Sequence, residues 1–419
     1  MSKRYALLGL SLSAIAVAGT SGTASAAERL TYSKDIMPIL QENCIECHRP
    51  NGANMGGMVA PMAFTSYAEA RPWAKSMAKA VSQRKMPPWA LAPEHDGVFM
   101  NERLMADEDR QKIVDWVAQG AKRGNPKDMP IPMEFPDIEG WAIGEPDAVL
   151  TMPEPYFVPD DLLDATKYFP TVVTEAQMPV DRWIKKVEFK PGSEVVHHII
   201  ASPFGGIAPG NLPAEYRDGY SAKARAGQKY VWNMHYHKEP GPGTGMFDQS
   251  SLGVIFYPEG YTPEHVLSTN PLGPLGFKIP AGDPNYAASS TYTFEKDTLI
   301  NAMMPHMHYR GKKVLYELTY PDGVEETLLS VPKYDFNWQM SYKFKEPKAV
   351  PAGTKVKITG WWDNSENNPS NPDSTIDVTW GEATHEEMLF GWLSFTNADE
   401  DHTSKHRVSF RDNVESSDD

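Results

Sequence analysis

Cysteine is nearly missing from this chain of 419 residues, which holds only Cys44 and Cys47. Two cysteines form one disulfide at most, so disulfides cannot be what stabilises a protein of this size. The two cysteines stand three residues apart, and His48 follows them directly. We therefore expect them to serve a chemical purpose.

Positive charge is also scarce: 40 Lys and Arg stand against 55 Asp and Glu, for a net charge of −15. Such a balance argues against nucleic acid or an anionic membrane as a partner. Beyond the N-terminal apolar run, no segment approaches the roughly 18 consecutive apolar residues of a transmembrane helix. We expect a mature chain without a membrane span.

The N-terminus has the form of a secretory signal peptide. Lys3 and Arg4 precede an apolar run over residues 6–18, and Ala24-Ser25-Ala26 follows as a cleavage site of small residues. This pattern predicts a signal peptide over residues 1–26 and a periplasmic or secreted protein.

The motif Cys44-Ile-Glu-Cys47-His48 is typical of covalent haem c attachment. In such motifs the cysteines form thioethers with the haem and the histidine binds the iron. A redox-active cysteine pair would need a βαβ frame, and a zinc half-site would need two further ligands nearby. The motif therefore favours haem over both alternatives.

Helical periodicity surrounds this motif. One pattern comes before it, and a second begins at residue 107 with three acidic residues that suit a helix N-terminus. The apolar positions of these patterns are Ile36, Ile39 and Leu40, then Ile113, Trp116 and Val117. We expect a small all-α domain over residues 27–125, which resembles a class I cytochrome c domain.

A methionine commonly supplies the sixth iron ligand of such a haem. Met86 is our first candidate, because the prolines of Met86-Pro87-Pro88-Trp89 hold the following chain extended, away from helix. The other candidates in this region are Met55, Met58, Met62, Met77, Met100 and Met105.

Five prolines mark residues 126–150, where helix and strand signals are few. This composition predicts an extended linker. An ordered strap packed across the next domain is the alternative.

From residue 151 onward the patterns are those of antiparallel sheet. Val314–Leu318 and Thr327–Val331 flank Pro321-Asp322-Gly323, which predicts a hairpin, and Thr354–Ile358 alternates polar and apolar residues. Many short strands separated by turns indicate sandwiches or barrels. We expect two all-β sandwich domains, over residues 151–288 and 289–419.

Histidines gather at two places in the first of these domains. His197 and His198 are adjacent, and neighbours on a regular strand point to opposite faces, so binding one ion through both requires a bulge or twist, or the use of different ring nitrogens. The third ligand would come from the run Met234-His235-Tyr236-His237, with His235 preferred and His237 the alternative.

The second domain contains His306 and His308, two residues apart and hence on one face of a strand. Met388, in the run Thr384-His385-Glu386-Glu387-Met388, supplies a soft thioether suited to Cu(I), whereas imidazole suits both copper states. This set points to copper that cycles between oxidation states. His385 is a candidate for supporting the ligands, and His95, His265, His402 and His406 are expected on the surface.

Five motifs follow one another along the chain: His197-His198, Met234-His235-Tyr236, the run from His306 to Gly311, the loop Asp363–Asp373, and Glu386-Glu387-Met388. Over about residues 180–395, this order resembles the copper type II, ascorbate-dependent monooxygenases, which include peptidylglycine α-hydroxylating and dopamine β-monooxygenases. The resemblance implies two jelly-roll sandwiches, each holding one copper across a solvent-filled cleft. It also implies that His197, His198 and His235 hold the electron-transfer copper. His306, His308 and Met388 would hold the copper that meets O₂ and substrate.

The activity implied by the resemblance is hydroxylation of a C–H bond of a small organic substrate by O₂. The electrons would pass from the haem to the His197/His198/His235 copper, in place of or beside an external donor such as ascorbate or a redox protein. Met304 and Trp392 stand where the peptide-processing members have arginine and tyrosine, so peptide amidation is not expected. The alternative from another class is a non-catalytic haem and copper electron-transfer protein, whose copper site would need no cavity for a substrate.

Overall fold

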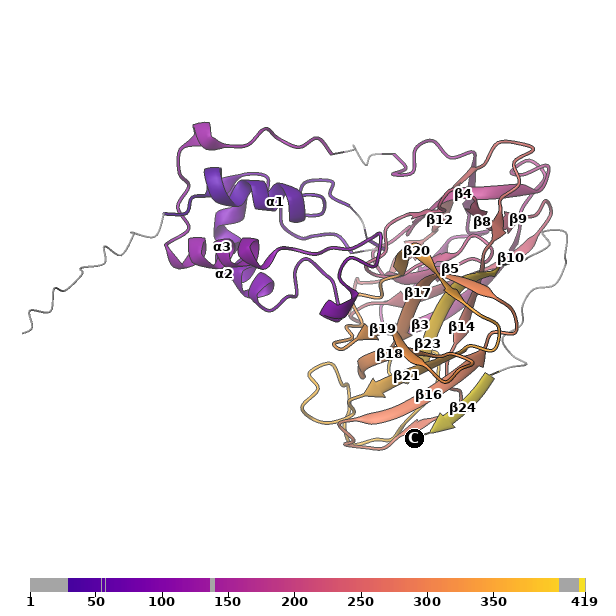
Figure 1. Cartoon of the computed structure of the whole chain (residues 1–419). Helices are drawn as coiled ribbons and strands as arrows, with labels where there is room; N and C mark the ends of the chain where they lie inside the picture. The colour runs from indigo at the N-terminus through magenta and orange to yellow at the C-terminus, as the bar shows by residue number, and fades with distance from the viewer. Residues whose placement is uncertain (1–28, 54, 57, 136–139, 399–413, 419) are drawn as a thin grey trace, which may run out of the picture.

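The computed structural model describes residues 29–53, 55–56, 58–135, 140–398 and 414–418 (Figure 1). The predicted signal peptide, together with His402 and His406, lies outside the described residues. None of the described helices has the length and apolar character needed to cross a membrane. A small helical part lies to one side of a large all-β part (Figure 1), as the sequence predicts.

The helical part contains three α-helices around one apolar core. They are α1 (Met37–Asn43), α2 (Tyr67–Ser82) and α3 (Asp107–Ala118), with short turns at Tyr32–Ile36, Pro93–His95 and Pro126–Asp128. The core includes Tyr32, Leu40 and Trp116. Helices α1 and α3 confirm the two helical patterns that flank the haem motif.

Helix α2 is an element that the sequence reading missed. Its start carries a capping box: the Ser66 hydroxyl accepts the Glu69 backbone N–H at 3.3 Å and donates to the Glu69 carboxylate at 2.9 Å. Serine followed by glutamate three residues later is a readable signal for a helix N-terminus. That signal was present and could have located the helix.

Four main antiparallel sheets make up the all-β part. The first two come from the N-terminal half, in strand orders β1-β12-β4-β7, with β9 also on β4, and β3-β10-β5-β6. Their strands are β1 (Ala148–Thr151), β3 (Asp164–Val172), β4 (Arg182–Lys190), β5 (Val196–Ile200), β6 (Gly206–Ile207), β7 (Ala214–Glu215), β9 (Lys223–Ala224), β10 (Lys229–His237) and β12 (Ser251–Phe256).

The other two main sheets come from the C-terminal half, in the orders β14-β23-β17-β20 and β19-β18-β21-β16-β24. Their strands are β14 (Ser268–Leu272), β16 (Tyr286–Thr293), β17 (Thr298–Met307), β18 (Gly311–Thr319), β19 (Glu325–Val331), β20 (Tyr342–Val350), β21 (Lys355–Trp362), β23 (Leu389–Asn397) and β24 (Val414–Asp418). Strands β18 and β19 confirm the predicted hairpin. Each half has its own apolar core, and the jelly-roll form of the halves stays a prediction.

Three two-stranded pairs complete the described strands. Strand β2 (Tyr156–Val158) pairs with β11 (Met246–Asp248), β8 (Tyr220–Ser221) with β13 (His265–Val266), and β15 (Lys278–Ile279) with β22 (Val378–Thr379). Because β13 still pairs within the first half and β14 joins the second, the halves divide between Val266 and Ser268. The boundary predicted near residue 288 is therefore about twenty residues too late.

A segment of the predicted haem domain belongs to the core of the second β half. Leu91 and Phe99 are buried in that core, and the Phe99 ring stacks on Phe344 with centroids 4.9 Å apart. His95, expected on the surface, is only 5% exposed, and its Nε2 accepts the Ser330 backbone N–H at 2.9 Å. The haem domain is thus anchored in the β region by its own chain.

The proline-rich segment 126–150 divides between its two neighbours. Its beginning packs on the helical part, where the Ile131 carbonyl accepts from Gln41 at 3.0 Å. Its end packs on the first β half, where the Ile143 N–H donates to Glu188 at 3.1 Å, and β1 already starts at Ala148. Apart from residues 136–139, which are not described, the segment contacts both of its neighbours, and the linker and strap alternatives both stay predictions.

Candidate functional site

A β-bulge turns two adjacent histidines toward one space. On β5, His198 pairs with His235 of β10, but the next pair is Val196 with Tyr236, so His197 is the extra residue. The irregularity is a bulge, one of the alternatives by which both rings can share a ligand. Nitrogens of His197, His198 and His235 all lie within 4.8 Å of one another.

Strand alternation directs the histidines of both halves toward each other. On β10, Trp232, Met234 and Tyr236 lie in the core of the first half, so His235 and His237 take the opposite face. On β17, Met303 and Met307 lie in the core of the second half, which places His306 and the following His308 on its outer face. The histidine faces of the two halves therefore meet.

The two groups of histidines are in contact. The rings of His198 and His306 stack with centroids 5.6 Å apart, and the His197 ring stacks on Phe336 of the second half at 4.4 Å. The cleft implied by the resemblance does not separate these rings, because the outer faces of the two sheets pack directly and Phe336 fills the space beside His197.

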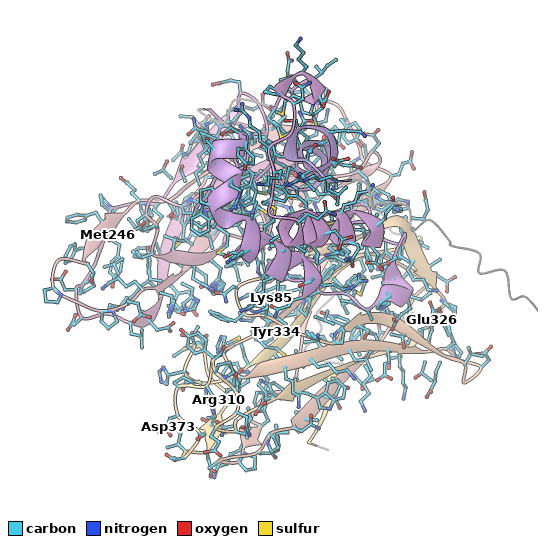
Figure 2. The ribbon with its side chains drawn as sticks, turned by 90° about the vertical axis from the view of Figure 1, so that its left-hand side faces the viewer. Lys85, Met246, Arg310, Glu326, Tyr334 and Asp373 are labelled. Atoms are coloured by element: carbon cyan, nitrogen blue, oxygen red, sulfur yellow. The ribbon has the colours of Figure 1, made fainter. Side chains whose placement is uncertain are left out.

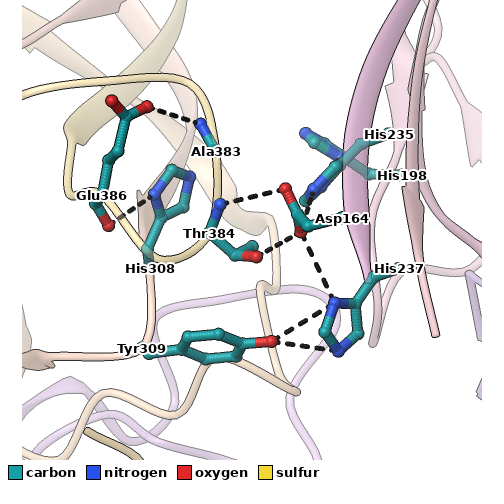
Figure 3. Close-up of polar contacts among 9 residues, drawn as sticks. All are labelled: Asp164, His198, His235, His237, His308, Tyr309, Ala383, Thr384 and Glu386. Carbon is teal, nitrogen blue, oxygen red and sulfur yellow. Dashed lines mark hydrogen bonds and ion pairs between the residues drawn. The ribbon is translucent and has the colours of Figure 1, made fainter. Parts of the chain in front are cut away.

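Asp164, on β3, orients the ring of His235. Its carboxylate lies 2.9 Å from His235 Nε2, 3.4 Å from His237 Nδ1 and 3.1 Å from the Thr384 backbone N–H (Figure 3). Burial alone would raise the pKa of Asp164, but hydrogen bonds from His235, His237 and Thr384 outweigh it and hold this pKa well below its usual range. An ionised carboxylate accepts the Nε2–H of His235 and so directs Nδ1, the other ring nitrogen, toward His198.

This Nδ1 of His235 faces a second imidazole nitrogen. His235 Nδ1 and His198 Nδ1 lie 3.1 Å apart. Two nitrogens held about 2.0 Å from one tetrahedral ion are separated by about 3.3 Å, so this spacing suits a shared cation.

His197 provides the clearest test of whether a metal fits. Both of its ring nitrogens are buried and have no hydrogen-bond partner among the described residues. Burial, followed by the neighbouring His235 and His237, holds its pKa well below the usual value, so the ring is neutral. Buried polar atoms are rarely left unpaired, and a neutral imidazole that lacks partners fits a metal ligand.

The second pair of histidines also has fixed protons. His306 Nδ1 donates to Gln339 Oε1 at 2.6 Å, and His308 Nδ1 donates to the Glu386 carbonyl at 3.2 Å (Figure 3). Burial lowers the pKa of His306 to about 4 and that of His308 well below its usual value. Both rings are therefore neutral, with Nε2 free to bind a metal.

Met388 lies beside His308 at the end of the sheet. The last pair between β17 and β23 is Met307 with Leu389, so His308 and Met388 are the next residues on either side. Met388 is 6% exposed. His385, by contrast, is exposed and contributes only its backbone carbonyl, which accepts from Arg310 Nη1 at 2.8 Å.

His237, the alternative third ligand, has other partners. The Tyr309 hydroxyl lies 3.0 Å from its Nε2 and 3.2 Å from its Nδ1 (Figure 3). Tyr309 belongs to the second half, so His237 helps to hold the halves together. The geometry favours His235 over His237 beside His197 and His198.

A buried network holds the turn after His308. The Glu387 carboxylate accepts the backbone N–H groups of His308 at 3.1 Å and Arg310 at 2.6 Å, and the Trp362 indole N–H at 2.9 Å. Burial raises the pKa of Glu387 to about 8 against these hydrogen bonds and the Arg310 charge. The Arg310 side chain donates to Asn364 Oδ1 at 2.9 Å and to the Asp373 carbonyl at 3.5 Å. Figure 2 labels Arg310 and Asp373 next to each other.

This network gives the asparagine-proline loop a role that sequence reasoning did not find. Asn364 accepts from Arg310 and also donates to the carbonyls of Pro280 and Ile376. The loop thereby ties the Arg310 side chain, in the turn after His308, to the segments at Pro280 and Ile376.

The haem motif is arranged for attachment. His48 Nδ1 donates to the Met62 carbonyl at 3.1 Å, which leaves Nε2 for the iron. Burial, then the neighbouring Cys47, raises the pKa of Cys44 to about 12, whereas a redox-active cysteine needs a lowered thiol pKa. The arrangement speaks against the redox-pair alternative.

Met86 lies after α2, and its carbonyl accepts from Arg110 Nη1 at 3.1 Å. Met55 is nearer to the motif, because its sulfur lies 3.6 Å from Cys47 Sγ. Met86 as the sixth iron ligand stays a prediction.

Two surface pockets lie away from the histidines. One, of about 230 Å³, is lined by residues that include Arg182, Trp183 and Tyr261, and the other, of about 220 Å³, by residues that include Arg84 and Arg110. Neither adjoins the candidate copper ligands.

Comparison with known proteins bears on the helical part. Residues 37–121 match the family model for cytochrome c. A comparison with curated proteins finds no relative of this chain. The match includes α1, the Cys44–His48 motif, α2 and α3, and it implies one covalently bound haem c and haem-mediated electron transfer. Residues 37–121 of this chain form a cytochrome c domain.

Proposed function

We propose that this chain is an exported copper-dependent monooxygenase whose cytochrome c domain supplies the electrons. The observation that carries the proposal is His197, a neutral imidazole that a bulge turns toward His198 and His235 and whose two buried ring nitrogens have no described hydrogen-bond partner. A structural histidine at this depth would be expected to have one.

The chain would hold two copper ions. His197, His198 and His235 would bind one, and His306, His308 and Met388 the other, on jelly-roll halves as the resemblance implies. Copper would supply one-electron redox chemistry and O₂ activation. In the cytochrome domain, Cys44 and Cys47 would attach the haem, with His48 and Met86 as iron ligands.

The protein's own residues would fix this chemistry in place. Asp164 orients His235, Gln339 orients His306, and the Glu386 carbonyl orients His308. Direct packing of Phe336 on His197 excludes water from one side of the site. The reaction would insert one atom of O₂ into a substrate C–H bond, while two electrons and two protons convert the other atom to water.

A second candidate is a haem and copper electron-transfer protein without a substrate. The observation that favours it is the close packing at the histidines, where the His197 ring stacks on Phe336 and the His198 ring on His306. A relay site has no need of a substrate cavity.

Metal analysis followed by product analysis separates the two. We expect two copper ions and one haem per chain in the purified protein. Isotopically labelled O₂ would then be supplied with reduced protein and a panel of small aromatic and aliphatic compounds. Label in one hydroxylated product, absent in a Met388→Ala variant, supports the monooxygenase. Full copper without labelled product from any compound supports the electron-transfer protein, and absence of copper contradicts both.

A further inference from the structure

One peptide group touches both the haem domain and the support of the histidines. The N–H of the peptide between Pro209 and Gly210 donates to the Met55 carbonyl at 2.8 Å, and its C=O accepts the Gln339 backbone N–H at 2.8 Å. The Gln339 side chain in turn accepts from His306 Nδ1 at 2.6 Å. Hydrogen bonds and covalent bonds thus join Met55 to His306 without a gap.

The Met55 end of this chain of bonds lies at the haem attachment point. Its sulfur is 3.6 Å from Cys47 Sγ, the atom expected to carry a haem thioether. Met55 is 2% exposed, so no layer of solvent separates its sulfur from Cys47 Sγ.

Two glycines allow the close packing at this contact. Gly56 has φ +65° and Gly210 has φ +97°, in the left-handed region that favours glycine. A Cβ on Gly56 would collide with the Ala208 carbonyl, and one on Gly210 would lie 3.0 Å from Met340 Cγ. A side chain larger than hydrogen at Gly56 would therefore push the haem domain away from Ala208 and the adjoining Pro209–Gly210 peptide, and one at Gly210 would press on Met340 within the β part.

Asn211 locks the same contact from the β side. Its side-chain amide donates to the Gln339 carbonyl at 2.8 Å and accepts the Ser341 N–H at 2.8 Å. Gln339 itself is fully buried, and its amide also donates to the Phe336 carbonyl at 3.0 Å. The bridge between the haem domain and His306 is consequently fixed at each step.

We propose that electrons enter the histidine cluster at His306, through Met55, the Pro209–Gly210 peptide and Gln339. The route rests on the proposed function. Each transfer would oxidise haem Fe(II) to Fe(III) and reduce Cu(II) to Cu(I), one electron at a time. Electron tunnelling falls off steeply with distance and is faster through covalent and hydrogen bonds than across gaps. This route reverses the order implied by the resemblance, in which the His197/His198/His235 copper receives the electron first.

The onward step to the other copper is short. The His306 ring stacks on the His198 ring, with centroids 5.6 Å apart. A second contact between the domains, where the Trp89 ring lies 5.2 Å from Tyr342, leads instead into β20 and reaches no histidine directly.

The test uses the full-length protein loaded with haem and copper. The haem is reduced by a light flash, and its reoxidation by Cu(II) is followed through haem absorbance, after copper content and the Cu(II) EPR spectrum have been recorded. Gln339→Leu removes the acceptor for His306, whereas Gln339→Glu keeps one. Gly56→Ala breaks the bridge from the haem side without touching any histidine. Gly97→Ala is its matched control, because Gly97 also has positive φ (+88°) but a Cβ there meets nothing within 4 Å.

We expect Gly56→Ala to slow haem reoxidation at least tenfold with copper content unchanged, and Gln339→Leu to slow it at least tenfold in the protein fraction that retains copper. Gln339→Glu, which keeps an acceptor for His306, should reoxidise the haem faster than Gln339→Leu, and Gly97→Ala should stay within about twofold of the parent protein. A double variant, His197→Ala with His198→Ala, should still reoxidise the haem through the remaining copper.

If Gln339→Leu and Gly56→Ala both reoxidised the haem at the parent rate with full copper, the proposed route alone would be overturned. Loss of haem reoxidation in the His197/His198 double variant, with one copper retained, would do the same. A protein that takes up no copper would overturn the proposed function together with the route. Hydrogen exchange gives a readout that needs no copper: the Gly210 and Gln339 amides should exchange faster in Gly56→Ala than in Gly97→Ala, and equal rates would count against the bridge.

Discussion

The Asp164 carboxylate lies 2.9 Å from Nε2 of His235, although 71 residues separate them in the sequence. Asp164 also accepts the Thr384 N–H of the second β half. One carboxylate thus orients a candidate ligand of one copper and anchors the run that leads to Met388. Hydrogen bonding of this kind sets both the tautomer and the direction of a metal-binding imidazole.

Replacing Asp164 should weaken copper binding in the first half. Asp164→Asn keeps the size of the side chain but removes the charge that accepts the Nε2 proton of His235. We expect copper affinity to fall by about 10–100-fold. Competitive titration with a copper chelator measures it. Asp161→Asn is the matched control, because Asp161 is exposed and lies three residues away; equal affinity in both variants would contradict the assignment.

His235 and His237 should differ in their effect on copper stoichiometry. His235 belongs to the cluster with His197 and His198, whereas His237 is held by Tyr309 and Asp164. We expect His235→Ala to lose one copper per chain and His237→Ala to retain both. Metal analysis after desalting gives the answer. The reverse pattern would make His237 the third ligand.

Local pattern revealed the histidines but not what surrounds them. The adjacency of His197 and His198 was enough to raise a bulge as one way to bind a shared ion, because side-chain direction in a strand depends only on neighbouring residues. Asp164 could not be found in the same way. It comes near His235 only through the pairing of β3 with β10, and strand register over such a separation is not encoded locally.

Long-range contacts also decide how the chain divides between its parts. Strand β14 contains Pro271, whose missing N–H is tolerated because β14 is the edge strand of its sheet, and β14 joins the second half only through its pairing with β23. Phe99 and His95 follow the haem motif in sequence, but their burial comes from the second β half, more than 200 residues later. Helix α2 differs, because its Ser66–Glu69 capping box was readable.

The anchoring of the haem domain should depend on pH through His95. Burial lowers the pKa of His95 below its usual 6.5, with Glu94 and Asp96 acting in the opposite direction. The unfolded chain therefore binds the proton first, so stability is present above about pH 6.5 and is lost as pH falls toward the lowered folded pKa. A proton on Nε2 would also displace the Ser330 N–H.

Thermal unfolding from about pH 7.5 to 5.5 checks this dependence. The unfolded chain also protonates the other histidines with lowered folded pKa values in this interval, so the quantity that matters is the difference in stability between the parent protein and His95→Gln. We expect the parent to lose more stability than the variant as pH falls. Parallel curves for the two proteins would show that His95 takes no part.

Glu387 should be essential to the second copper site, although it binds no metal in our proposal. Glu387→Met leaves three buried donors without an acceptor, namely the N–H groups of His308, Arg310 and the Trp362 indole. Each unpaired buried donor costs about 1–3 kcal/mol, so the free energy of unfolding should fall by at least about 3 kcal/mol. Glu326→Met is the matched control: its carboxylate is 40% exposed and pairs with Lys348, so its loss should cost at most about 1 kcal/mol. Denaturant unfolding gives the stabilities, and metal analysis of the folded fraction should show that Glu387→Met alone loses the copper assigned to His306 and His308. Equal stabilities and full copper in both variants would mean that the turn after His308 is held by something other than this carboxylate.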